Sequence, residues 1–375
     1  MSLPSITRKT RLVLEDGTSL IGVSFGAEAS VVGEVVFNTA MTGYIETLTD
    51  PSYRGQILVL TQPIVGNYGV PAPRPIGSLD RPYESDRIQP QGLVVQHYSS
   101  TYSHHAASRS LGEWLSAEGV PGVAGIDTRT LTRVLREHGT MRGWLFPDHM
   151  SLDEARETAH AVEMTSQVFR QVAPEAVRVY GDGGSPRILL VDCGAKDGIV
   201  QSLLDRGAHV IRIPWFADLS AAAAEVDGIL IGNGPGDPQN LTELTEHLRL
   251  LTETFNGPVF GVCLGHQLLA LAAGAKTYKL PYGHRGINQP VQDVSTRRCY
   301  VTSQNHGYAV DGATLPPHWE TWFVNLNDGT NEGIRRRNKP QFSVQFHPEA
   351  SPGPQDTSYL FDEFISLAAS LRRGS

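Results

Sequence analysis

The residues best placed to do chemistry lie in the segment Gly261-Val262-Cys263-Leu264-Gly265. A short β-type run enters this segment at residue 258, and an apolar helical run, residues 268–273, leaves it. Glycines two positions before and after a central residue are typical of a nucleophile elbow, a strained strand-to-helix turn in which larger neighbours would collide. The following helix offers backbone N–H groups and a positive dipole end, which favour a thiolate. Cys263 is the candidate nucleophile, with a buried structural cysteine as the alternative.

A cysteine nucleophile needs a base, and a histidine stands at the end of another strand-like run. Residues 342–346 form that run, and His347-Pro348-Glu349 follows it. His347 is the candidate acid and base for Cys263, and Glu349, two residues later, is placed to orient the imidazole as in a catalytic triad. Taken alone, His347 would be interpreted as a structural histidine, and its combination with Cys263 reverses this interpretation.

Two further polar or glycine-rich segments follow predicted strands. Residues 233–238, Asn-Gly-Pro-Gly-Asp-Pro, let a backbone approach a ligand closely, and the N–H of Gly234 is placed with that of Leu264 to bind a developing oxyanion. In residues 303–308, Ser-Gln-Asn-His-Gly-Tyr, Asn305 and backbone groups are placed to hold the charged ends of an amino acid. Each segment alone is also compatible with an ordinary turn or polar loop.

Several other kinds of site are excluded by the motifs. The chain contains neither GxGxxG nor GxxxxGK[ST], the usual nucleotide-binding loops. Cys193, Cys263 and Cys299 stand apart, without the CxxC or HExxH spacing of zinc sites, so we expect no metal in this chain. Cys193 and Cys299 are interpreted as structural or incidental.

The order of strands and helices in the second half predicts a doubly wound α/β domain that positions these residues. Strand-like and helical runs alternate from residue 187 to 273, which is typical of parallel βαβ units. The tail returns to antiparallel strands, so the sheet is expected to be mixed. Ligands of such sheets bind beyond the carboxyl ends of the strands, where the motifs above lie. The predicted strands are 187–191, 209–214, 228–231, 258–262, 299–303, 321–325, 333–337 and 341–346, and the predicted helices are 195–205 and 264–273.

The first half reads as a separate, strand-rich α+β domain over residues 1–150. Asp16-Gly17 is a hairpin signal between two strand-like runs, and Asp127 and Gly139 are expected to cap a helix at its two ends. Residues 151–186 begin with a polar helix, lose periodicity and end in a Gly-rich run, so they are expected to be a linker before the domain of residues 187–375. The other predicted strands are 33–38, 56–61 and 92–97, and a further helix is predicted over 110–118.

Composition limits the class of protein. The 375 residues carry a net charge of −8, whereas nucleic-acid binders usually present a basic face. Three cysteines make no disulfide framework and favour a reducing compartment. No apolar run reaches the roughly 18 residues that span a bilayer, and the N-terminus lacks the apolar core of a secretory signal. We therefore expect a cytoplasmic protein, with mitochondria as an alternative, that binds neither nucleic acid nor membrane.

Four motifs in order give the second half a family resemblance. Asn-Gly-Pro-Gly-Asp, Gly-Val-Cys-Leu-Gly-His-Gln, Gln-Asn-His-Gly and Phe-His-Pro-Glu resemble class I, triad-type glutamine amidotransferases, over residues 187 to about 370. The first half narrows this to the small subunit of carbamoyl-phosphate synthetase, which is similar at residues 33–39, 41–44, 48–53, 125–129 and 351–354. Residues 191–194 and 288–290 resemble fungal small subunits and the glutaminase segment of fused pyrimidine-synthesis proteins, so a free subunit and an excised segment both stay possible.

The resemblance implies an activity and a set of site residues. Cys263 would form a γ-glutamyl thioester with L-glutamine, His347 would be the acid and base, and Glu349 would orient it. Tyr308 would contact glutamine through its backbone, and Ser52 would reach the pocket from the other domain. The implied glutamine contacts are Ser52, Gly234, Gly236, Leu264, Gln267, Asn305, Gly307 and Tyr308.

The resemblance also implies a partner. Ammonia would pass to a large synthetase subunit, or to a fused synthetase domain, that makes carbamoyl phosphate from bicarbonate and ATP for arginine or pyrimidine biosynthesis. We expect no cofactor in this chain, with ATP and magnesium on the large partner. Two other functions compete: an amidotransferase serving another synthetase, and a regulatory subunit without glutaminase activity. The presence of Cys263, His347 and Glu349 argues against the second of these.

Overall fold

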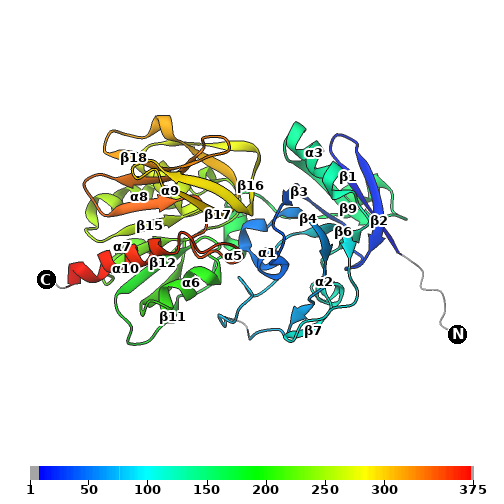
Figure 1. Cartoon of the computed structure of the whole chain (residues 1–375), viewed down its shortest axis with the longest axis horizontal. Coiled ribbons are helices and arrows are strands. Elements are labelled where there is room, and N and C mark those ends of the chain that lie inside the picture. The colour runs from blue at the N-terminus through cyan, green and yellow to red at the C-terminus, as the bar shows by residue number, and fades with distance from the viewer. Residues whose placement is uncertain (1–7, 76, 373–375) are drawn as a thin grey trace. The chain divides into compact units, whose positions relative to one another are not determined.

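The computed structural model describes residues 8–75 and 77–372, which form two compact units that divide between Glu163 and Met164 (Figure 1). Each unit has its own sheet and its own buried core. None of the helices in the described residues has the length and apolar character needed to cross a membrane.

The sheet of unit 1 closes on itself. Its strands run in the order β10-β3-β4-β6-β8-β2-β1-β9, and β9 also pairs with β3. Gly17, with φ +89°, makes the predicted hairpin turn between β1 and β2 possible, because this backbone conformation favours glycine. The strands of unit 1 are β1 (Lys9–Leu14), β2 (Ser19–Ser24), β3 (Val31–Asn38), β4 (Gln56–Val65), β5 (Val70–Pro71), β6 (Gly92–Tyr98), β7 (Ala107–Arg109), β8 (Gly122–Ala124), β9 (Met141–Pro147) and β10 (His160–Ala161).

Side-chain caps start α2 and α3 of unit 1, and the sequence predicts the second of these caps, Asp127. Asp127 accepts a hydrogen bond from the N–H of Thr130, and this cap starts the helix that packs against β3 and β4. Ser110 and Glu113 form a reciprocal capping box at the start of α2. The helices are α1 (Tyr44–Thr49), the 3₁₀ helix η1 (Pro51–Tyr53), α2 (Leu111–Ala117), α3 (Thr128–His138) and α4 (Leu152–Thr158).

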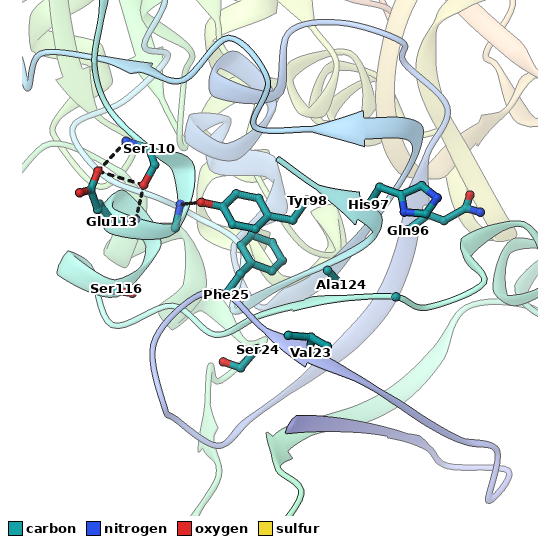
Figure 2. A pocket seen from close by; sticks show the side chains of 12 residues that line it. Val23, Ser24, Phe25, Gln96, His97, Tyr98, Ser110, Glu113, Ser116 and Ala124 are labelled. Carbon is teal, nitrogen blue, oxygen red and sulfur yellow. Dashed lines mark hydrogen bonds between the residues drawn. The ribbon is translucent and has the colours of Figure 1, made fainter. Parts of the chain in front are cut away.

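A pocket of about 770 Å³ lies in unit 1, between the end of β2, the end of β6 and the start of α2 (Figure 2). Phe25 stacks on Tyr98 with ring centroids 4.2 Å apart, and the Tyr98 hydroxyl accepts a hydrogen bond of 3.1 Å from the N–H of Gly112. These contacts fix the aromatic wall of the pocket to the first turn of α2.

Unit 2 has the predicted mixed sheet, in the order β11-β13-β12-β14-β15-β20-β19-β17-β16-β18. Neighbouring strands from β13 to β20 are parallel, and β19 pairs with β20 in the antiparallel direction. The strands are β11 (Arg178–Tyr180), β12 (Arg187–Asp192), β13 (His209–Pro214), β14 (Gly228–Ile231), β15 (Val259–Val262), β16 (Lys276–Asp293), β17 (Cys299–Asp311), β18 (Trp319–Asn325), β19 (Asn331–Arg336) and β20 (Gln341–Val344).

Helices cover the parallel part of this sheet. Helices α8 and α9 pack against each other, as do α6 and α10, and Figure 1 shows the two pairs on opposite sides of β15. The doubly wound interpretation is therefore confirmed. The helices are α5 (Ser166–Val172), α6 (Asp197–Leu204), α7 (Leu219–Ala223), α8 (Thr242–Thr254), α9 (Leu264–Ala273) and α10 (Tyr359–Arg372), with 3₁₀ helices η2 (Pro238–Asn240) and η3 (Gly312–Thr314).

Two sequence interpretations differ from the structure. The segment 303–308 is not a loop but the middle of β17, where Asn305 pairs with Arg285 of β16. β16 is a long strand whose irregular pattern of polar and apolar residues does not indicate a strand in sequence. The expected linker 151–186 is largely built into the units. Ala155 of α4 packs with Val13 and Phe146, and β10 pairs with β3, whereas β11 pairs with β13 in unit 2. Exposed, polar elements of this kind show little periodicity in sequence.

A buried ion cluster fixes the first loop of unit 2. The guanidinium of Arg212 donates to Asp192, to Asp197 Oδ1 at 2.6 Å and to the carbonyl oxygen of Ala195 at 2.8 Å. Asp192 Oδ1 also accepts from the N–H groups of Gly194 and Ala195, at 2.6 Å each. The turn between β12 and α6 is thereby held at both ends by charged hydrogen bonds, which are about twice as strong as neutral ones.

Replacement of Arg212 by methionine should destabilise unit 2 strongly. The change leaves the carboxylates of Asp192 and Asp197 buried without their cation, and a broken buried pair costs about 3–5 kcal/mol. Urea denaturation would measure this. Arg249→Met is the matched control, because Arg249 pairs with Glu246 on an exposed helix face, where a pair contributes at most about 1 kcal/mol. Equal losses from both variants would contradict the assignment.

Candidate active site

Cys263 lies in the strained turn that the elbow pattern predicts. Strand β15 ends at Val262, α9 begins at Leu264, and Cys263 between them has φ +54° and ψ −103°. Its N–H donates to the carbonyl oxygen of Val344 at 2.9 Å, which ties the turn to β20. A non-glycine residue at positive φ costs about 1–3 kcal/mol, so the surrounding packing must impose the conformation.

The two flanking glycines are required by close backbone approach. A Cβ on Gly265 would overlap the carbonyl oxygen of Ile231, and a Cβ on Gly261 would stand 2.6 Å from the carbonyl oxygen of Gly265. Any side chain here would push α9 away from the strands β14 and β15. The glycines therefore let the helix begin directly behind the thiol, which is the geometry a nucleophile elbow needs.

The thiol is buried and faces β17. Cys263 is 2% exposed, and its Sγ lies 3.7 Å from the carbonyl oxygen of Asn305. His347 lies next to the same strand, because its N–H donates to the carbonyl oxygen of Ser303 at 2.9 Å in an isolated bridge. The end of β20 and the middle of β17 thus meet around the cysteine.

His347 and Glu349 are hydrogen-bonded to each other. Nδ1 of His347 lies 2.6 Å from Oε1 of Glu349, and because a carboxylate only accepts, Nδ1 is the donor. Nε2 makes no hydrogen bond within the described residues, so it is the nitrogen left for proton exchange. Burial lowers the pKa of His347, but the Glu349 carboxylate and then Cys263 outweigh this effect and raise the pKa to about 10.

A buried lysine completes the chain of charges. Lys196 Nζ donates to Glu349 Oε1 at 3.0 Å and to the carbonyl oxygen of Ser351 at 2.5 Å. Burial raises the pKa of Glu349, but Lys196 first and His347 second overcome it and lower the pKa to about 2. Glu349 is therefore a carboxylate, and His347 is cationic, throughout the physiological range.

The glycine-rich turn after β14 lies against the start of α9. A Cβ on Gly234 would stand 2.8 Å from the Leu264 side chain, so the backbone at 234 reaches the first residue of the helix. Asn233 is buried, and its side-chain oxygen accepts from the N–H of Lys196 at 2.9 Å. Gly236, with φ +79°, continues the turn in a conformation that favours glycine.

Gln267 connects α9 to β17. Its side-chain nitrogen donates to the carbonyl oxygen of Tyr308 at 2.8 Å and to Gln345 Oε1 at 3.0 Å. At Gly307 an added Cβ would have only the end of the Arg285 side chain, 3.3 Å away, near it. All of the predicted site residues except Ser52 belong to unit 2, and these are Cys263, Leu264, Gln267, Asn305, Gly307, Tyr308, Gly234, Gly236, His347 and Glu349.

Comparisons with known proteins agree with this geometry. The family model "Glutamine amidotransferase class-I" matches residues 189–367, and "Carbamoyl-phosphate synthase small chain, CPSase domain" matches residues 12–145. The "Carbamoyl phosphate synthase arginine-specific small chain" of Neosartorya fischeri is 48% identical over 95% of this chain and 79% of its own length. The chain belongs to the carbamoyl phosphate synthase small-chain family.

A second small chain and one solved structure also resemble this chain. The arginine-specific small chain of Schizosaccharomyces pombe is 47% identical over 97% of this chain and 88% of its own length. Among solved structures, a glutamine amidotransferase from Thermotoga maritima is 19% identical, with a TM-score of 0.36, over 44% of this chain and 76% of that one.

Ser52, the remaining predicted contact, belongs to unit 1 of this small-chain family member. It lies in η1, where it is buried and its N–H donates to Asp50 Oδ1 at 2.9 Å. Its contact with glutamine stays a prediction. Lys196 is the residue that sequence reasoning missed. It lies just beyond the carboxyl end of β12, where ligands of parallel sheets gather, and that rule was the signal available.

Replacement of Lys196 by methionine should slow glutamine hydrolysis by about tenfold or more. The variant removes the cation that holds Glu349 ionised, and each lost 1.4 kcal/mol or so of stabilisation is a tenfold loss of rate. Steady-state kinetics would check this. Lys339→Met is the control, because Lys339 bonds to carbonyl oxygens of Thr252 and Glu253, just before β20, and should keep wild-type kcat. Unchanged kcat in Lys196→Met would contradict the role.

The pKa of His347 should fall in Cys263→Ser, because a neutral hydroxyl replaces the group whose charge helps to raise it. A raised pKa means that this interaction stabilises the fold fully below the unfolded value of about 6.5 and is lost as pH rises through about 10. NMR titration of the histidine ring would follow the change. A pKa that is the same in both proteins would show that Cys263 does not face the imidazole.

Proposed function

We propose that this chain hydrolyses L-glutamine to glutamate and ammonia at Cys263 and supplies the ammonia to a large synthetase partner for carbamoyl phosphate synthesis. The observation that carries the proposal is the buried row Cys263, His347, Glu349 and Lys196, with the cysteine at φ +54° between glycines that admit no side chain. A structural cysteine has no need of a strained turn or of a paired, cationic histidine beside it.

The first half of the reaction breaks the amide bond. The Cys263 thiolate attacks the side-chain carbonyl carbon of glutamine, and the oxygen takes the negative charge. N–H groups at Gly234 and Leu264 would stabilise that oxyanion. His347, cationic because its pKa is about 10, donates the Nε2 proton to the leaving nitrogen. Ammonia departs, and a γ-glutamyl thioester on Cys263 remains.

The second half regenerates the enzyme. His347, now neutral, takes a proton from a water molecule at Nε2 as the water oxygen attacks the thioester carbon. The carbon–sulfur bond breaks, glutamate leaves, and the thiolate and imidazolium pair is restored. Glu349 keeps the Nδ1 proton in place in both halves, because it remains a carboxylate with a pKa near 2.

The amino-acid end of glutamine would bind along β17 and α9. Asn305, Gly307 and the backbone of Tyr308 lie on β17, and Gln267 lies on α9 with its side chain already directed at Tyr308. Gly236 would admit the substrate backbone closely, and Ser52 is a further contact proposed from the family resemblance alone. The other contacts are proposed from the family resemblance and from their grouping around Cys263.

The partner and its cofactors complete the proposal. The relatives are named small chains, so a large subunit, or a fused synthetase domain, would consume the ammonia together with bicarbonate. ATP and magnesium would bind to that partner and no cofactor to this chain. Because the relatives are named arginine-specific, we propose arginine biosynthesis as the pathway.

The chemistry requires a reducing compartment, since only a reduced Cys263 attacks glutamine. The cytoplasm satisfies this requirement, and the mitochondrial matrix would satisfy it too. We propose the cytoplasm, with mitochondria as the alternative.

Replacement of Cys263 by serine should abolish glutamine-dependent synthesis by the complex with its large partner, by about a thousandfold or more. Synthesis from added ammonia should stay at the wild-type rate, because ammonia bypasses the glutaminase. Glutamate release and carbamoyl phosphate formation would be measured in parallel.

Cys299→Ser is the matched control, because Cys299 is exposed on another strand and the variant should hydrolyse glutamine normally. Wild-type glutamine hydrolysis by Cys263→Ser would disprove the mechanism. A co-purifying partner without carbamoyl phosphate activity would disprove the pathway.

A further inference from the structure

A second buried polar network lies behind the glutamine-binding strand, and the mechanism above does not use it. It contains His284 of β16, Gln304 and His306 of β17, and Glu332 of β19, all buried. His284 and His306 are register partners, with ring centroids 4.9 Å apart. Buried polar groups of this kind are costly unless their hydrogen bonds are complete, so each proton in the network has to be placed.

The outer half of the network reaches the surface. His284 Nε2 lies 2.8 Å from Asp328 Oδ2, and Asp328 is partly exposed. His284 Nδ1 lies 3.4 Å from Glu332 Oε1, and the side-chain nitrogen of Asn325 donates to the same oxygen at 3.0 Å. Burial lowers the pKa of His284, but Glu332 and Asp328 outweigh it and raise the pKa. The two carboxyl groups beside His284 therefore favour its protonated form.

The inner half reaches the active site. Gln304 Nε2 lies 3.0 Å from Glu332 Oε2, and Gln304 Oε1 lies 3.1 Å from His306 Nε2. His306 Nδ1 lies 2.9 Å from the carbonyl oxygen of Tyr308, which also accepts from Gln267. A continuous hydrogen-bonded path thus joins Glu332 to the backbone of the predicted glutamine contact Tyr308.

The hydrogen-bond partners of His306 determine how many protons the inner half holds. A carbonyl oxygen only accepts, so Nδ1 of His306 carries a hydrogen. Gln304 donates to Glu332 and to Thr302 Oγ1, and its oxygen is left facing Nε2 of His306. In this arrangement Nε2 also has to carry a hydrogen, which makes His306 a cation beside an ionised Glu332.

A half-turn of the Gln304 amide gives a second arrangement, which gives up the bond to Thr302 Oγ1 because that hydroxyl donates to the carbonyl oxygen of Gln289. A protonated Glu332 then donates to the Gln304 oxygen, and the amide nitrogen donates to a neutral His306. Burial favours this form. It raises the pKa of Glu332, and with the charges of His284, Arg285 and His347 it lowers the pKa of His306. Both arrangements hold one proton more than a neutral His306 together with an ionised Glu332 would hold.

We propose that Glu332 is a positioning residue for glutamine, which shares one bound proton with His306 and holds the Asn305–Tyr308 segment through Gln304. The inference rests on the proposed glutaminase function. Loss of the shared proton, or of the carboxyl group, would leave two acceptors facing each other or an unpaired amide. The substrate-binding stretch of β17 would then lose its fixed shape, while Cys263, His347 and Glu349 would keep theirs.

A metal ion does not explain the cluster equally well. The ligand atoms of His284, His306 and Glu332 lie within 4.8 Å of one another, which is close enough for three ligands. However, the side-chain amides of Asn325 and Gln304 each lie 3.0 Å from one oxygen of Glu332. In either orientation of the Gln304 amide, these hydrogen bonds occupy the oxygens that a cation would need.

The test compares Glu332→Leu with Glu332→Gln in the complete complex with the large partner. Glu332→Leu removes the path and should raise KM for glutamine about tenfold or more, the range for a lost buried hydrogen bond, with a smaller change in kcat. Glu332→Gln supplies an N–H where the protonated carboxyl has an O–H, so KM near neutral pH should stay within about threefold of wild type.

The pH dependence of KM distinguishes an effect of the shared proton from an effect of packing alone. The titratable and charged groups around Glu332 and His306 are His284, Asp328, Arg285 and His347. Wild-type KM should rise at alkaline pH as the shared proton is lost, whereas the KM of Glu332→Gln should not follow this rise. Glu320→Gln is the matched control, since Glu320 pairs with Arg335 and Arg337 on β18 and should behave as wild type.

Three results would overturn the proposal. Wild-type KM in Glu332→Leu is one, equal impairment of Glu332→Gln and Glu332→Leu is the second, and stoichiometric bound zinc that Glu332→Gln loses is the third. Ammonia-dependent synthesis reports whether each variant still folds and assembles. A wild-type complex that uses ammonia but never glutamine would instead overturn the proposed function itself, and the inference with it.

Discussion

The site depends on one backbone conformation, the positive φ of Cys263. An L-residue adopts φ +54° only where its neighbours leave no alternative, and here the neighbours are the central strand β15 and the helix α9. Helix α9 lies so close to the strands that Gly265 is in backbone contact with Ile231, and the N–H of Cys263 is bonded to β20. The same close packing that strains the turn places Cys263 beside β20, the strand that leads to His347. Stability of the sheet and position of the nucleophile are therefore a single property of unit 2.

The second constraint is the balance between the buried charges around Cys263. Lys196, Glu349 and His347 form a row of alternating sign, and an ionised Cys263 would complete it with no net charge. Each buried ion needs the next one, because an isolated charge would be too costly to desolvate. The members come from loops after three different strands, β12, β15 and β20, which meet at one edge of the parallel sheet. The Arg212 cluster fixes the first of these loops and with it the backbone from which Lys196 projects.

Sequence reasoning predicted the parts of this site whose signal is local. The glycines around Cys263 and the two-residue spacing of His347 and Glu349 are short patterns with a direct steric or chemical meaning. Lys196 could not be found in the same way, because only the tertiary fold brings its loop to Glu349. The polar residues of the β17 segment indicate a loop when read from sequence alone, yet in the structure they are buried on a strand, where they pair with other polar groups. Residues 151–186 are predicted to be a linker for a related reason. Their short strands β10 and β11 add to existing sheets, and such elements need little periodicity of their own.

The polarity of β17 follows from the two surroundings it has to satisfy. Successive residues of a strand point to opposite faces, so Gln304, His306 and Tyr308 share one face while Asn305 and Gly307 share the other. On that first face Gln304 and His306 are hydrogen-bonded to each other, and Gln304 is also hydrogen-bonded to Glu332. The Asn305 carbonyl contacts the thiol of Cys263. An apolar residue at 304 or 306 would pack well but would leave the Tyr308 carbonyl and the Glu332 carboxyl with fewer partners. The strand therefore carries polar side chains because its backbone lies against the thiol of Cys263, and a backbone in that position must be held by directional bonds rather than by packing alone.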